Sequence, residues 1–581
     1  MAPAALFAVV ADSDRLYRAL GQVEVLREPL SGEGASRFLL RAIGKGRSIP
    51  FAELPPQWNQ SSLLVTKRVL HQGILTSLAT RLTFTPQLQG TQLLVELQVE
   101  PRLPQLAWLV KLYAQGSLWH LVKTLRLIDA GVSRGQKPLL KPARLSEEPL
   151  AGAVRKTKTR VLPEEQPVID ALVEHLKQCD DLEVDSLRLE ALSEQLGQPA
   201  KTLLGVLLWA SSEGLLQFGL SVLCPSCRNP AARFDHLFDL PDEAFCNLCE
   251  LRIPVDFANN VEVSFRPAEP LRKVPRPLYA SVNPAAMPHV VTQLVLPGMT
   301  KLTIPVPHEP GEFRLWARGG AHATLQVNTL GPQMATITVG DAMVPLSVEV
   351  ALGGTLEIDH QTAQARHFKI ERPEWKATRL TAHDLTLHPL FRRLFPGELP
   401  NVAVQFPVPT VALLKLRFPM VGELCAALGD GSAFRLIADC LEAVCRAIEA
   451  GGGAVLRLCT DGVSAAFAGD GAALTATWAA KKAVRKLRAD NPFAHLLVLK
   501  AGVFVGPASV VRVDGRLDYF GQTEAICDRM LAEAHPSDIL VSASCLAHTE
   551  QHPDLRAGPI FSLAGKGLPT AISVVRLTLE P

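Results

Sequence analysis

The chain has 581 residues, 48% of them hydrophobic, and its 59 basic side chains nearly balance its 57 acidic ones, leaving a formal net charge of +2. One core cannot serve this length, so we expect roughly three to five domains at about 150 residues each. The charge balance excludes a global positive field of the kind that drives strong nucleic-acid or anionic-membrane binding. No apolar run reaches the roughly 18 residues that a membrane span needs, so the sequence predicts no span.

The 11 cysteines divide into one tight group of four and others that sit singly in apolar patterns. This distribution favours reduced, buried thiols over a disulfide framework. The opening apolar run has no basic residue before it, and charge resumes at Asp12, so we expect no secretion signal. We therefore predict a cytoplasmic protein.

Residues 1–132 show a mixed pattern: a short helix over 13–20, alternating strands over 62–69, 81–87 and 92–100, and a helix over 108–128. The segments ADSDRLYRALG and QGTQLLVELQVEP resemble a START-like, polyketide-cyclase-type helix-grip domain. The resemblance implies a curved antiparallel sheet that grips a long helix around an apolar cavity. It also implies a lipid or other apolar ligand, with a filled core and no ligand as the open alternative.

Residues 133–162 are polar and Pro-rich, which predicts a flexible linker. Its basic cluster of Arg155, Lys156, Lys158 and Arg160 lacks interleaved aromatic residues. We therefore expect a solvated linker rather than a phosphate-binding segment.

Residues 163–220 predict helices over 168–179, 186–196 and 201–214. The run LRLEALSEQLGQPAKTLLGVLLWASSEGLLQF resembles a winged helix-turn-helix. A DNA reader needs cationic and amide side chains on its second helix, where Lys201 is the only base. We therefore favour a protein-packing module and do not expect a nucleic-acid partner.

Residues 221–259 carry two CxxC knuckles, Cys224 with Cys227 and Cys246 with Cys249. Each CxxC turn points two thiolates at one ion, and two such turns complete a tetrahedron. With four positions filled, no site remains for water or substrate. The sequence predicts a structural zinc ribbon, and the alternative of unrelated or redox thiols stays open.

Residues 260–372 alternate in the manner of strands, for example over 261–265, 302–306 and 335–339, and predict a small antiparallel β-sandwich. A Pro-rich connector over 373–408 follows. The segments VEVSFRP and PHVVTQLVLPGMTKLTI, together with the zinc knuckles, resemble an uncharacterised region that precedes class III cyclase domains in some bacterial proteins. That resemblance supplies no mechanism.

Residues 409–576 predict a βαβ start, with a buried strand over 411–416 and a helix over 434–448, and then the run RLDYFGQTEAICDRM. The pieces LGDGSAFRLIADCLEAV, TDGVSAAF, LDYFGQT and DILVSAS resemble the class III nucleotidyl cyclase domain, a ferredoxin-like βαββαβ fold. In such cyclases two aspartates hold two Mg or Mn ions against a nucleoside triphosphate. One metal activates the ribose 3′-hydroxyl for attack on the α-phosphate, in a site between two subunits.

The resemblance places the first metal-binding aspartate at Arg417, so a cation stands where the family has an anion. The second falls on Asp461, which is retained and would be a catalytic ligand of Mg or Mn. Asp461 is equally explained by a type I′ hairpin turn, which favours Asp-Gly. Glu423 and Asp430 are the nearest carboxylates that could substitute for the missing one.

The remaining positions of the family pattern are partly kept. Arg457 stands at the base-selecting lysine, and Asp518 matches the acidic residue that reads adenine N6. Ala525 replaces the asparagine that orients the ribose, while Arg529 matches the arginine that stabilises the pentavalent phosphate. Asp518 and Arg529 could instead simply pair with surface charges.

The sequence thus predicts a multidomain α+β signalling protein that ends in a degenerate cyclase. We expect it to bind ATP or another nucleoside triphosphate and to form a homodimer or heterodimer through this domain. One alternative is half of a composite enzyme. Another is an active adenylate cyclase that converts ATP to cAMP and pyrophosphate.

Overall fold

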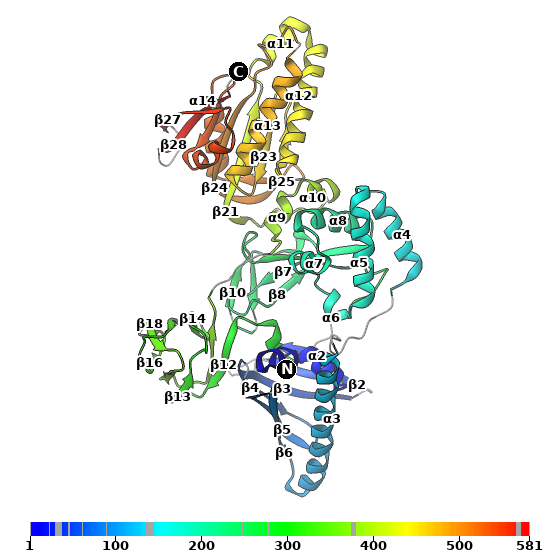
Figure 1. Ribbon diagram of the computed structural model, residues 1–581, viewed down its shortest axis with the longest axis vertical. Helices are drawn as coiled ribbons and strands as arrows, with labels where there is room; N and C mark the ends of the chain where they lie inside the picture. Colours follow the sequence, from blue (N-terminus) through cyan, green and yellow to red (C-terminus); the bar gives the residue numbers. More distant parts are fainter. Residues whose placement is uncertain are drawn as a thin grey trace.

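Figure 1 shows the computed structural model, an elongated molecule with its N-terminal unit and its C-terminal domain at opposite ends. The structure describes residues 2–22, 24–29, 38–44, 47–60, 62–88, 90–134, 145–246, 248–249, 251–275, 279–373, 379–489, 491–564 and 571–579. Among the helices of these residues, none combines the length and the apolar character that crossing a bilayer requires.

The N-terminal unit is an antiparallel sheet crossed by one long helix, α3. α3 packs on β6 and buries Val110, Leu121, Thr124, Leu125 and Ile128, which recur at helical spacing. The START-like assignment stays a prediction. The elements are α1 (Pro3–Val10), α2 (Ser13–Ala19), β1 (Val25–Pro29), β2 (Phe38–Gly44), β3 (Arg47–Asn59), β4 (Leu63–Leu70), β5 (Leu75–Gln87), β6 (Gly90–Pro101) and α3 (Ala107–Ser133).

Two sheets enclose a core that includes Phe313, Ile337 and Phe368, as a β-sandwich does. The prediction that the sandwich is antiparallel is wrong in part, because β15 pairs with β18 and β16 pairs with β19 in parallel. One sheet contains β12 (Val290–Leu296), β14 (Gly311–Ala317), β15 (His322–Asn328), β18 (Ser347–Ala351) and β20 (Arg366–Glu371). The other contains β13 (Thr300–Pro305), β16 (Met334–Val339), β17 (Met343–Val344) and β19 (Thr355–His360). β12 also pairs with β3, so the first sheet runs on into the N-terminal unit.

The middle of the chain corrects two predictions. The predicted linker 133–162 contains helix α4 (Glu147–Lys158), because Leu150, Ala153 and Thr157 recur every three or four residues and are buried. The predicted sandwich strand 261–265 lies in β11 (Val261–Pro267), which pairs with β7 (Leu216–Leu223) beside β8 (Pro230–Phe234).

The helices of this region are α4, α5 (Gln166–Gln178), α6 (Asp181–Val184), α7 (Leu189–Leu196) and α8 (Ala200–Ser212). β9 (Glu243–Cys246) and β10 (Leu251–Pro254) form a hairpin next to β8. α8 buries Leu203, Val206, Leu207 and Ala210, which accounts for its apolar composition. The winged-helix assignment stays a prediction.

The connector predicted over 373–408 includes two helices, α9 (Ala382–Leu387) and α10 (Pro389–Leu394). Thr381 caps α9 through a capping box with Asp384, and Pro389 opens α10. α10 packs on α8 and on β22 of the C-terminal domain, so the segment joins two units.

The C-terminal domain is a mixed sheet in the order β22-β23-β21-β24-β26-β28-β27, with β25 beside β24. Helices α12 and α13 pack together over this sheet (Figure 1). The strands are β21 (Phe406–Arg417), β22 (Ala454–Leu458), β23 (Gly462–Phe467), β24 (Lys500–Val513), β25 (Arg516–Phe520), β26 (Ile539–Ser542), β27 (Leu555–Leu563) and β28 (Ile572–Leu579). The helices are α11 (Val421–Leu428), α12 (Asp430–Ala450), α13 (Asp470–Arg488) and α14 (Gln522–Glu533).

Lys481 on α13 makes the stability of this domain depend on pH. Its buried ammonium donates to the carbonyls of Leu499 (2.7 Å) and Ser537, and burial lowers its pKa from 10.5 to about 7. Between these values the unfolded chain holds a proton that the folded chain lacks, so stability rises with pH from about 7 to 10.5. Below about pH 7 the cost of charging Lys481 in the interior is fully present.

We expect the protection free energy of α13 amides, measured by hydrogen exchange corrected for intrinsic rates, to rise by up to about 1.4 kcal/mol per pH unit in this range. Lys481→Met should remove the rise, and Lys482→Met, at an exposed neighbour, should keep it. An equal slope in both variants would contradict the assignment.

Candidate functional site

The side chains of Arg417 and Asp461 meet where β21 ends and β23 begins. Arg417 is the last residue of β21, and Asp461 lies in the turn between β22 and β23. The Arg417 Nε lies 3.2 Å from the Asp461 Oδ2, and both side chains are partly exposed. The Phe418 amide donates to the Asp461 carbonyl at 2.7 Å, which fixes the turn against the end of β21.

Gly462 is what allows this approach. It pairs with Arg417, and a Cβ at this position would lie 2.2 Å from the Leu416 carbonyl oxygen. The alternative of a type I′ turn at Asp461 is wrong, because such a turn needs positive φ at both central residues and neither Asp461 nor Gly462 has it. Close packing against β21, not turn geometry, accounts for the glycine.

A second cluster lies beside the first, between β22, β25 and α14. The Arg457 Nε lies 2.8 Å from the Asp518 Oδ2, and its Nη2 bonds the Glu524 carboxylate. Glu524 also lies 3.5 Å from the Lys415 Nζ, which in turn lies 2.6 Å from Asp528. Cations and carboxylates therefore alternate across this face.

Asp518 is the buried member of the cluster. Burial raises its pKa, and the opposing pull of Arg457 does not fully offset this. For Arg457, burial alone would lower the pKa, but the carboxylates of Asp518 and Glu524 outweigh burial and raise it. Arg457 on β22 is a partly buried cation, and it lies next to the buried carboxylate of Asp518 on β25.

Sequence analysis missed Lys415, Glu524 and Asp528. Lys415 stands two residues before Arg417 on one strand, and alternation places both on one face. Glu524 and Asp528 are four residues apart on α14, which places them on one helical face. These spacings were the available signal.

The structure does not bring every predicted residue into these clusters. Arg529 lies on α14, is 46% exposed, and pairs with Glu533 at 3.4 Å. Ala525 is exposed on the same helix. Glu423 lies on α11 and Asp430 is the first residue of α12, whereas within the described residues the ion-pair partner of Asp461 is Arg417.

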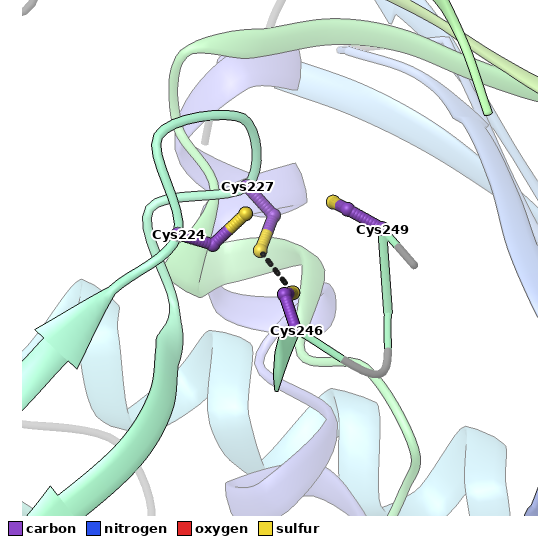
Figure 2. Close-up of side chains that lie close together, drawn as sticks. All are labelled: Cys224, Cys227, Cys246 and Cys249. Carbon is purple, nitrogen blue, oxygen red and sulfur yellow. Dashed lines mark hydrogen bonds between the residues drawn. The ribbon is translucent and has the colours of Figure 1, made fainter. Parts of the chain in front are cut away.

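The four predicted cysteines form one buried group. Their sulfur atoms all lie within 4.8 Å of one another, and no other group in the described ranges meets the same test for a metal site. Cys224 and Cys227 follow β7, Cys246 ends β9, and Cys249 precedes β10, so two turns face each other (Figure 2). Four convergent thiols fit a tetrahedral zinc ion, and neither carboxylate nor water is needed to complete it.

From the sandwich side, one side chain contacts a cysteine of the group and a second contacts the turn between Cys224 and Cys227. The buried Lys369 Nζ, on β20, lies 3.1 Å from the Cys249 Sγ. It also lies 4.7 Å from the centre of the Trp316 ring. Burial would lower the Lys369 pKa, but the Cys249 and Cys227 sulfurs raise it. The His289 Nε2 donates to the Ser226 carbonyl at 2.9 Å, and burial lowers the His289 pKa to about 4.

A cavity lies in the N-terminal unit between α2, the sheet and α3. Its walls are mainly apolar and include Leu16, Leu82, Leu97 and Leu121, with Tyr17 as a polar member. Burial raises the Tyr17 pKa, so the phenol is neutral. The cavity is of the kind that accepts an apolar molecule.

Comparison with known proteins finds no matching family model and no matching curated protein. Among solved structures, the chain is similar to the adenylyl cyclase CyaB from P. aeruginosa, at 17% identity over 31% of this chain and 97% of that one, with a TM-score of 0.27. It is also similar to the guanylyl cyclase Cya2, at 13% identity over 30% and 94%, with a TM-score of 0.27. An adenylate/guanylate cyclase/hydrolase from Silicibacter pomeroyi matches at 20% identity over 30% and 99%, with a TM-score of 0.25.

Proposed function

We propose that the C-terminal domain is a degenerate class III nucleotidyl cyclase that binds a nucleoside triphosphate but turns it over weakly. The Arg417 to Asp461 ion pair carries this proposal. The retained carboxylate of Asp461 is already neutralised by the guanidinium of Arg417, which stands where the resemblance expects the first metal-binding aspartate. Sequence resemblance over LDYFGQT and TDGVSAAF and the order of strands and helices support the nucleotide as ligand.

Magnitudes favour weak turnover. A guanidinium in place of a metal ligand opposes a cation by about 3 kcal/mol per unit charge at about 5 Å and an effective dielectric near 20. Because Arg417 is about half exposed, solvent screening reduces this figure. Metal polarisation of phosphoryl oxygens contributes several kcal/mol, and Ala525 removes a further positioning interaction. Together with the repulsion from Arg417, these losses imply a rate reduction of at least about 10³.

The remaining cluster suits recognition rather than chemistry. Arg457 and Asp518 offer a donor and an acceptor side by side, as base reading requires. Glu524 holds Arg457 from the other side and is itself paired with Lys415. If the site lies between two subunits, this half could complete the site of a partner cyclase that brings both metal aspartates. That composite enzyme is the second candidate, and a fully active adenylate cyclase is the third.

The cysteine group supports a structural zinc. Its four buried thiols leave no position for substrate, so zinc here would hold the β7, β8 and β9 region together without taking part in turnover. The cavity of the N-terminal unit supports a lipid or another apolar molecule as a separate ligand.

Nucleotide binding tests the main proposal. We expect calorimetry to detect ATP binding by the full chain whether or not Mn²⁺ is present, and we expect no cAMP from the purified protein. cAMP formed only after mixing with a complete cyclase of the same cell would favour the composite enzyme. Turnover by the purified chain alone would refute both.

Arg417→Asp tests the ion pair directly. The change should create a second carboxylate beside Asp461 and raise the affinity for Mn²⁺-ATP relative to metal-free ATP, because two anions now attract the ion. Arg446→Asp, an exposed charge reversal on α12, is the matched control and should leave that ratio unchanged. Equal ratios in both variants would count against the role given to Arg417.

Metal analysis tests the zinc site. We expect Cys249→Ser to lose bound zinc, measured by mass spectrometry of the purified chain, and Cys459→Ser, at an exposed single cysteine, to retain it.

Lys369→Met should weaken the affinity for zinc by about 10- to 100-fold in competition with a chromophoric chelator, since it removes a partner of a ligand sulfur. Lys301→Met, at an exposed lysine, is its control. Full zinc in Cys249→Ser would exclude the site.

A further inference from the structure

Helix α3 of the N-terminal unit has an outer face that nothing in the described structure covers. Trp108, Leu112 and Trp119 are 68%, 61% and 66% exposed on this helix. Large apolar side chains scattered singly are ordinary on a protein surface, but these recur on one line. At 3.6 residues per turn, positions 108, 112 and 119 lie within a narrow stripe opposite the buried Val110, Leu121 and Ile128.

Cations share this stripe. Lys111, Lys123 and Arg126 are exposed, and helical spacing places them on the same side as the two tryptophans. The Lys123 Nζ lies 5.2 Å from the centre of the Trp119 ring. The sequence from 102 to 128 contains no Asp or Glu, and the one carboxylate of the helix is Asp129, three residues after Arg126. We call this set Trp108, Lys111, Leu112, Trp119, Lys123 and Arg126 the outer face of α3.

Helix α3 belongs to the N-terminal unit, which lies at the opposite end of the molecule from the C-terminal domain (Figure 1). Its 27 residues span about 40 Å at 1.5 Å per residue, so the outer face of α3 is long.

We propose that the outer face of α3 docks the protein on an anionic lipid surface. Tryptophan is the side chain that prefers the boundary between headgroups and acyl chains, and lysine and arginine beside it pair with anionic headgroups. The helix would lie in the plane of the interface rather than cross it. The near-zero net charge of the whole chain does not oppose this, because the attraction comes from a local surface within a Debye length of the lipid.

A second copy of the chain suits this face less well. A two-fold contact through α3 would bring the three cations of each copy together, with Asp129 as the one carboxylate of each helix to offset them. An anionic surface removes this repulsion and covers the tryptophans at once. The charge of the face therefore favours lipid over self-association.

Vesicle co-sedimentation of the full chain tests the proposal. We expect binding to phosphatidylcholine vesicles that contain phosphatidylserine, weaker binding to pure phosphatidylcholine, and a fall in binding as salt rises. The variant Lys111→Gln with Lys123→Gln should weaken binding to the anionic vesicles by about 25-fold, since each charge near such a surface contributes about fivefold. Trp108→Ser with Trp119→Ser should abolish it.

Matched controls keep the result specific. Leu330→Ser and Arg252→Gln change exposed residues away from α3, with side chains that are equally apolar or equally charged, and should bind as the natural chain does. The substituted side chains on α3 are exposed, so thermal unfolding should be unchanged in every variant. Binding that is equal for neutral and anionic vesicles, or equal in the α3 and control variants, would overturn the proposal. A dimer that disappears in the tryptophan variant would assign the face to a second copy instead.

Discussion

The contact between Lys369 and the cysteine group is the constraint on which the middle of the molecule depends. A buried ammonium is costly unless an anion meets it, and the only sulfur or carboxylate that an ion pair or hydrogen bond gives it within the described residues is Cys249. Lys369 belongs to the sandwich, whereas Cys249 belongs to the cysteine turns. The charge of one unit is therefore satisfied by the other, and the two must fold against each other.

The same principle applies to the two ion-pair clusters of the C-terminal domain, at lower cost. Arg417 neutralises Asp461 at the surface, while Arg457 neutralises the more deeply buried Asp518. A site built for divalent metal keeps an excess of negative charge, because the ion itself supplies the compensation. Here the protein supplies both signs from its own side chains. This balance stabilises the ion pairs without a bound ion.

Sequence reasoning anticipated what depends on local pattern. The CxxC spacing located the cysteine group, and the run from 516 to 530 located β25, Gly521 and α14. Sequence reasoning failed where a segment packs against a part of the chain that is distant in sequence. β11 pairs with β7, a strand that precedes both cysteine turns, and α4 is helical because Leu150 and Ala153 find a core that the linker composition conceals. The contact of Lys369 with Cys249 could not be predicted, because a single lysine in a strand does not indicate which side chain it will meet.

The units also share one buried apolar cluster, which runs from Phe7 in the N-terminal unit to Tyr519 in the C-terminal domain. Arg392 on α10 crosses the last junction and donates to the Leu517 carbonyl at 2.9 Å, next to Asp518. A continuous buried cluster does not by itself couple a site in one unit to a site in another. Coupling requires an element between them that has two arrangements. The segment α9 to α10 is one place where such an element would lie, because it is short, borders both units and contacts the strand that carries Asp518. The rings of Phe257 and Phe406, whose centres lie 4.4 Å apart, form a second direct contact between the units. If either contact had two arrangements, a ligand at one end would bias the ion pairs at the other through it.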